Sequence, residues 1–160
     1  MATQPLKLPA LDPAAVVPAR GSNYPERYKL AVAGRGKRKL GDALGLKNFG
    51  VNLTTIQPGS ASALRHWHAK QDEFVYIVSG ELVLITDAGE QLLTAGMCAG
   101  FPAGKADGHH LVNRSAFDAV VFEVGDRTPG DAAVYPDDDL AARAVPQGGW
   151  QFARKDGTPY

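Results

Sequence analysis

Glycine and proline interrupt this chain so often that its apolar runs are all short. The 160 residues include 18 glycines and 11 prolines. Because the runs between them are rich in β-branched and aromatic residues, they predict strands and not helices. Turn-forming sequences such as QPGS, SGE and DAGE separate the runs, a spacing typical of an all-β sandwich or a small antiparallel barrel. The expected strands are residues 50–56, 74–78, 81–86 and 119–124.

Length and charge narrow the class of protein further. A chain of 160 residues and 17.0 kDa is expected to form one domain with a sizeable core. Its 17 basic and 17 acidic residues balance, so no excess charge indicates a nucleic-acid partner. No apolar run approaches the roughly 18–20 residues that a membrane-spanning helix requires, so we expect no membrane partner. The partner to expect is a small-molecule ligand or substrate.

The single cysteine and the N-terminal residues indicate where such a chain works. Cys98 has no second cysteine with which to form an intramolecular disulfide. The first 20 residues contain four prolines and no continuous apolar stretch, so they do not resemble a signal peptide. Both observations predict a cytoplasmic protein. We expect Cys98 itself to be a small buried hydrophobe.

Three regions can be separated by composition. Residues 48–125 contain the expected strands and form the predicted barrel. Residues 1–47 are an N-terminal arm and lead-in, within which the segment 34–45 (GRGKRKLGDALG) is basic, carries at most a short helix and is interpreted as a solvated basic face. Residues 126–160 form a C-terminal extension that we expect to pack on the barrel or on a partner, because it carries apolar area that water would otherwise contact. The segment ends with the aromatic residues Trp150, Phe152 and Tyr160.

Two of the four histidines lie two positions apart, in the sequence RHWHAKQDEF. In a strand, His66 and His68 share one face and Trp67 takes the other. Glu73 has the opposite parity, but a turn at AKQD would return it to the same cavity. Two explanations are open for such a pair: half-buried imidazoles of an ordinary strand, or half of a metal chelate.

The other two histidines are adjacent, in GHHLVN. Only one of them can face inward from a strand, and His109 shares parity with Asn113, so we expect these two to face the cavity and His110 to face away. A register shift of one residue would exchange the two imidazoles. Three imidazoles and one carboxylate suit one divalent transition metal, whether Mn, Fe, Co, Ni, Cu or Zn, with positions left for water or substrate.

The residues around these histidines resemble the two conserved motifs of the cupins. The first motif is matched by a glycine, the HxH pair, a glutamate and a second glycine, with a first gap one residue longer than usual. The second is matched with four residues, not two, between the P-x-G glycine and the histidine. The matching residues are Gly59, His66, His68, Glu73, Gly80, Gly96, Pro102, Gly104, His109 and Asn113.

The resemblance implies a cupin-type antiparallel β-barrel, or double-stranded jelly roll, that binds a metal between two sheets through His66, His68, Glu73 and His109. The C-terminal sequence GDRTPGD…YPDDDL is similar to that of small bacterial cupins, some of which have been named sugar-phosphate isomerases. The expected function is therefore a metal-dependent enzyme of unknown substrate, either an isomerase, for example of a sugar phosphate, or a dioxygenase. The alternative is a non-catalytic small-molecule sensor or binding module. Small cupins commonly pair, so we expect a homodimer.

Four further residues flank the expected ligands. Arg65 and Trp67 should face away from the histidines, one as a surface charge and the other in packing. Lys105 and Asp107 precede His109 and are expected in a solvent-exposed loop, the alternative being the rim of the cavity. No side chain stands out as the general base of a catalytic reaction.

Overall fold

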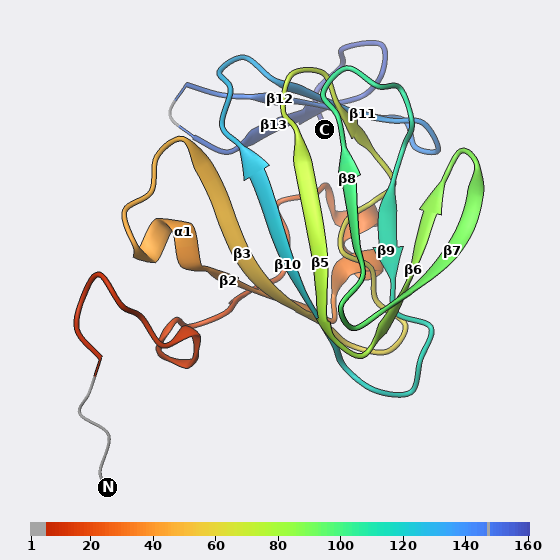
Figure 1. The fold of residues 1–160 in the computed structure, drawn as a ribbon. Coiled ribbons are helices and arrows are strands. Elements are labelled where there is room, and N and C mark those ends of the chain that lie inside the picture. The colour runs from red at the N-terminus through yellow and green to blue at the C-terminus, as the bar shows by residue number, and fades with distance from the viewer. Residues whose placement is uncertain (1–5, 147) are drawn as a thin grey trace, which may run out of the picture.

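The computed structural model describes residues 6–146 and 148–160, which form an all-β fold with a few short helical turns (Figure 1). The helical turns are η1 (Pro13–Ala15), η2 (Glu26–Val32) and α1 (Leu40–Ala43). None of the described helices is long and apolar enough to span a membrane. The strands are β1 (Ala19–Arg20), β2 (Arg35–Lys39), β3 (Phe49–Ile56), β4 (Trp67–His68), β5 (Glu73–Ser79), β6 (Glu81–Thr86), β7 (Gly89–Thr94), β8 (Cys98–Phe101), β9 (His110–Val112), β10 (Ala119–Asp126), β11 (Ala132–Tyr135), β12 (Leu140–Ala144) and β13 (Trp150–Ala153).

The largest layer is a six-stranded antiparallel sheet in the order β1-β2-β3-β10-β5-β8. Its central strands stand side by side at the front of Figure 1. The register places Glu123 of β10 opposite Asn52 of β3 on one side and Val75 of β5 on the other. Since side chains alternate between faces, these residues and their second neighbours line the inner face of the sheet.

Two smaller sheets complete the jelly roll. One has the order β7-β6-β9, and the other has the order β13-β12-β11-β4. The turn between β5 and β6 requires a glycine: Gly80 has φ +76°, and a Cβ there would lie 2.9 Å from the Cα of Ala119. This contact gives a physical reason for the glycine that closes the first cupin-like motif.

Two apolar clusters hold the layers together. The first joins the six-stranded sheet to β6, β7 and β9, and its residues are Ile56, Val75, Ile77, Leu82, Leu84, Leu93, Leu111, Ala119 and Val121. The second lies beneath β11 and β12 and includes side chains from both ends of the chain. Tyr24 and Phe152, for example, make an edge contact with ring centroids 5.3 Å apart. The N-terminal and C-terminal regions therefore pack on the same structure and on each other.

Two sequence-based expectations are wrong: the solvated basic face at residues 34–45 and the burial of Cys98. Residues 35–39 of the basic segment form strand β2, because pairing with β3 outweighs their weak intrinsic preference for strands, and only α1 matches the expected short helix. Lys37 is not part of a solvated face, since its Nζ lies 2.7 Å from Glu123 Oε2. Cys98 is exposed and not buried, because it pairs with Tyr76 on the outer face of the sheet's edge strand β8.

Candidate metal centre

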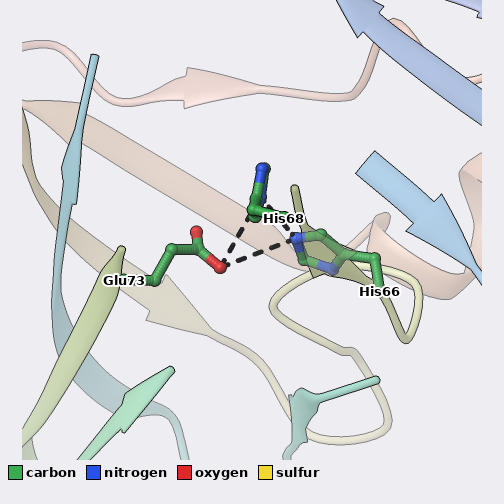
Figure 2. Close-up of side chains that lie close together, drawn as sticks. All are labelled: His66, His68 and Glu73. Atoms are coloured by element: carbon green, nitrogen blue, oxygen red, sulfur yellow. Dashed lines mark hydrogen bonds and ion pairs between the residues drawn. The ribbon is translucent and has the colours of Figure 1, made fainter. Parts of the chain in front are cut away.

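The HxH pair is held by short pairings on both sides. The backbone of His66 pairs with that of His109, with N–O distances of 2.8 and 3.2 Å, and β4 pairs with β11 through Trp67 and His68. His66 and His68 share one face, as expected, and their Nε2 atoms lie 3.1 Å apart. Figure 2 shows both rings turned toward the carboxylate of Glu73.

Glu73 reaches the histidines because the chain turns back between β4 and β5. Its Oε2 lies 3.8 Å from His66 Nε2, 3.6 Å from His68 Nε2 and 2.9 Å from His109 Nε2. The possible ligand atoms of His66, His68 and Glu73 all lie within 4.8 Å of one another. The structure therefore brings together all four residues that the sequence singles out.

The far nitrogen of each imidazole faces an oxygen acceptor. His66 Nδ1 lies 2.8 Å from the carbonyl oxygen of Leu64, and His68 Nδ1 lies 2.6 Å from Asp131 Oδ2. These contacts place the proton on Nδ1, so each Nε2 presents a lone pair toward the other at 3.1 Å. Two such lone pairs repel each other unless a proton or a metal ion lies between them.

The charge states of His66 and Glu73 also suit a bound cation. Burial lowers the pKa of His66 to about 4, so this imidazole is neutral and able to donate a lone pair at neutral pH. Burial alone would raise the pKa of Glu73, but the hydrogen bond from His109 and the nearby His66 and His68 lower it to about 2. The cluster thus combines a neutral imidazole with an ionised carboxylate.

The adjacent histidines take different roles. His109 is buried and contacts Glu73, and its ring stacks on Phe101 with centroids 3.5 Å apart. His110 Nδ1 instead lies 3.0 Å from the carbonyl oxygen of Ala63. Asn113 is buried like His109, but its Nδ2 donates to the carbonyl oxygens of Ile56 and Phe117, both at 2.7 Å. The expectation that Asn113 faces the metal cavity is wrong, because this amide closes the loop before β10.

Asp131 is a residue of this site that the sequence did not reveal. It is only 1% exposed, and its second oxygen accepts the backbone N–H of Lys70 at 2.7 Å. The pairing of β11 with β4 brings it beside His68, which lies 63 positions earlier in the chain. No local motif marks such a contact, since it depends on tertiary pairing.

Comparison with known proteins decides the family. The family model described as a Cupin domain matches residues 52–125. A structure from Silicibacter pomeroyi, described as a sugar phosphate isomerase from a cupin superfamily, is 46% identical over 95% of this chain and 96% of that chain, with a TM-score of 0.91. This chain belongs to the cupin superfamily. No protein of curated function matches it.

More distant structures resemble this cupin over less of its length. A proposed sugar phosphate isomerase from Acidithiobacillus ferrooxidans is 28% identical, with a TM-score of 0.70, over 79% of this chain and 80% of that one. A predicted oxalate decarboxylase from Thermotoga maritima is 21% identical, with a TM-score of 0.59, over 73% and 97% of the two chains. At that level of identity the likeness shows the fold alone.

Two openings reach the candidate metal centre of this cupin. A pocket of about 340 Å³ is lined by His68, Glu73 and His109 together with Trp67, Lys105 and Asp107. Lys105 lies in a solvent-exposed loop, as expected, with its side chain 65% exposed, and it also borders this pocket. Asp107 is 28% exposed and lines the pocket, which was the alternative expectation, and Trp67 borders a cavity. A second opening, a groove of about 730 Å³, is lined by all four candidate ligands, by residues of β2, β3 and β10, and by parts of both terminal regions.

Arg65 also differs from the surface charge expected of it. Its side chain is only 15% exposed and forms an ion pair with Asp137 at 2.7 Å and another with Asp87. Asp137 belongs to the turn after β11, so this contact ties the residue before the HxH pair to the C-terminal region. Arg65 therefore supports the site from outside the cavity.

Proposed function

We propose that this cupin binds one divalent transition metal through His66, His68, Glu73 and His109 and isomerises a sugar phosphate or a closely related hydroxycarbonyl compound. The observation that carries the proposal is the pair of opposed Nε2 lone pairs of His66 and His68, 3.1 Å apart beside an ionised carboxylate. Three imidazoles and one carboxylate fit a transition metal better than Mg²⁺ or Ca²⁺, which prefer oxygen ligands. The substrate class is supported by the 46% identity to the Silicibacter pomeroyi protein.

A metal held here would supply Lewis-acid polarisation of a substrate carbonyl. The protein's own residues orient the site. Asp131 and the carbonyl oxygen of Leu64 fix the two HxH rings, and the backbone pairing with His66 fixes His109. The groove of about 730 Å³ has the size of a small-molecule site, and Tyr135 and Trp150 are among the aromatic residues that line it.

Metal analysis and turnover assays test this proposal together. Protein purified without chelator should contain one equivalent of a transition metal, and it should isomerise at least one aldose or ketose phosphate under argon. The double variant His66→Ala/His68→Ala should lose both properties. Oxygen uptake without isomerisation would identify a dioxygenase, and tight binding without turnover would identify a sensor; either result would contradict the proposal.

We also propose that the protein works in the cytoplasm as a homodimer. The one cysteine, Cys98, is free and exposed, which suits a reducing compartment. Three large apolar side chains project from the outer face of strand β5, which lies next to the edge strand β8: Phe74, Tyr76 and Val78, each more than 40% exposed. A second copy, related by a two-fold axis, would cover this uncharged surface with the same surface.

Light scattering tests the dimer. The protein should have twice the 17.0 kDa mass of the chain, and Tyr76→Lys should reduce it to the mass of one chain. Lysine at Leu92, which is 55% exposed on β7, is the matched control and should leave the dimer intact. A wild-type protein of single-chain mass at micromolar concentration would refute the dimer.

A further inference from the structure

The inner face of the six-stranded sheet carries a polar group beside the candidate metal centre. Lys37 of β2 pairs in register with Thr54 of β3, and both side chains contact Glu123 of β10. Thr54 Oγ1 donates to Glu123 Oε2 at 2.9 Å, and Lys37 Nζ lies 2.7 Å from the same oxygen. The side chains of Lys37 and Glu123 are 27% and 17% exposed, so the pair is largely shielded from bulk water.

Both fixed contacts of Glu123 go to one of its two oxygens. Among the described residues, Oε1 of Glu123 has no hydrogen-bond partner within the protein. Oε1 is also accessible from the groove, since it is absent from the fully buried side-chain atoms that lack a hydrogen-bond partner among the described residues. The carboxylate is therefore held in place through Oε2, while Oε1 is available to a bound molecule.

Glu123 and the candidate ligands line the same groove. Gly125 lies opposite Glu73 in the register, and Glu123 lies two positions before it on the same face. Diagonal neighbours of this kind in an antiparallel sheet have Cα atoms about 7–8 Å apart, so the two carboxylates extend from neighbouring positions on one face into the same groove.

Glycine keeps that space open. A Cβ at Gly125 would be in van der Waals contact with Cγ of Glu73 at 3.7 Å, so a side chain larger than alanine there would extend into the space beside the ligand cluster. Gly50, opposite Gly125 on β3, likewise adds no side chain to the groove. The arrangement provides a cavity between a fixed carboxylate and a candidate metal site.

From this geometry we infer that Glu123 is the catalytic residue that transfers the proton in the isomerisation. The inference rests on the proposed function. Glu123 Oε1 takes the proton from the carbon next to the substrate carbonyl; the electron pair of that C–H bond forms a carbon–carbon double bond, and the carbonyl pair moves onto its oxygen. Glu123 then returns the proton to the former carbonyl carbon, while the hydroxyl proton passes from one substrate oxygen to the other. The reaction balances without an oxidant or reductant.

Lys37 and Thr54 are positioning residues in this scheme, since they hold Oε2 and leave Oε1 free. The competing explanation is that the three side chains only join β2, β3 and β10. The two explanations predict opposite results for Glu123→Gln, which keeps the shape of the side chain. A purely structural pair would lose stability and keep turnover, whereas a proton-transferring carboxylate would lose turnover and keep the fold and the metal.

The experiment compares metal-loaded wild type, Glu123→Gln, Glu123→Asp and the control Glu90→Gln. Glu90 also forms an ion pair, with Arg114 at 2.6 Å, but this pair is half exposed and outside the groove. Isomerisation of an aldose phosphate and incorporation of solvent deuterium into its C–H bonds are followed by NMR in D₂O. Metal content, Mn²⁺ affinity and urea unfolding provide readouts that do not depend on activity.

In Glu123→Gln, kcat and deuterium incorporation should fall by roughly 10²–10⁴-fold, the usual contribution of general acid–base catalysis. Its Mn²⁺ affinity should equal that of wild type, and Glu90→Gln should match wild type in every readout. Turnover by Glu123→Gln at the wild-type rate, or loss of its metal, would overturn the inference alone. Should Glu123→Gln not fold, full turnover by Glu123→Asp would overturn it and a large loss would support it. An inactive wild type would refute the proposed function and this inference with it.

Discussion

The two ends of the space between the sheets are built from the same strands but differ in chemistry. At one end, inward residues of β3, β5 and β10 are apolar and fully buried, with Ile56, Ile77 and Val121 at 0% exposure. At the other end, the next inward residue of β10 is Glu123, and β5 reaches Glu73 after one more buried residue, Val75. Two residues further along a strand, the environment changes from a packed core to an open polar groove.

Within a single strand, the residues at one end therefore stabilise the fold, and the residues at the other end form the candidate site. The apolar end stabilises the fold by removing side chains from water and packing them closely. The polar end instead collects lone pairs and carboxylates that oppose folding unless hydrogen bonds or a cation compensate them. Substitutions at the two ends should therefore change different measured quantities, and four experiments can test that separation.

The largest effect is expected from removing a candidate ligand. His109→Ala should weaken metal binding by more than the roughly 10–100-fold loss typical of removing an outer hydrogen-bond partner. The adjacent His110→Ala is the matched control and should keep its metal, because His110 contacts the Ala63 carbonyl and not Glu73. Elemental analysis and Mn²⁺ titration measure both. The reverse pattern would show that the other imidazole is the ligand.

At the apolar end, Ile77→Ala should lower the free energy of unfolding by about 2–5 kcal/mol, because it leaves a cavity where packing is complete. Its metal content per folded molecule should not change. Leu92→Ala, on the exposed face of β7, should change stability by no more than about 0.5 kcal/mol. Urea unfolding provides both values, and loss of metal from folded Ile77→Ala would contradict the separation of the two ends.

Acid should destabilise the metal-free protein through the polar end. His66 has a pKa of about 4 in the fold and 6.5 when unfolded, because burial disfavours its charged form. Its contribution to stability is complete above pH 6.5 and is lost as the pH falls to about 4, by up to about 3 kcal/mol. The pKa of Glu73, lowered to about 2, adds a second loss between pH 4.5 and 2.

Urea unfolding of chelator-treated protein between pH 7.5 and 4 would measure the first loss. The variant His66→Gln cannot take up a proton at this position, so its stability should fall less steeply over the same range. Equal slopes for the two proteins would show that His66 does not titrate between these pH values.

The smallest effect is expected from the support behind His68. Asp131→Asn keeps the size of the side chain but removes the charge that polarises the imidazole, so Mn²⁺ affinity should fall by about 10–100-fold. Asp139→Asn, which alters a half-exposed carboxylate paired with Arg154, is the control and should bind Mn²⁺ like wild type. Equal Mn²⁺ affinities for the two variants would show that Asp131 does not contribute to metal binding.

The sequence allowed the family and much of the site to be predicted because both depend on local patterns. Strand alternation puts His66 and His68 on one face, and turn sequences separate the strands around them. The sequence pattern could also have identified Glu123 as an inward-facing polar residue, since it is the one charged residue in the apolar run AVVFEV and shares parity with the buried Val121. The sequence could not show that Lys37, 86 positions earlier, would lie beside it, because strand order is set by tertiary packing.

The edge contact between Tyr24 and Phe152 has a consequence for how this cupin could diversify. Residues 19–24 from one end of the chain and Trp150 and Phe152 from the other border the same groove, whereas the candidate ligands come from residues 66–109 between them. What enters the groove can therefore change through the termini while the strands that carry the ligands stay as they are. In such a molecule, the ends of the chain shape the entrance of the groove, whereas the middle of the chain supplies the candidate ligands.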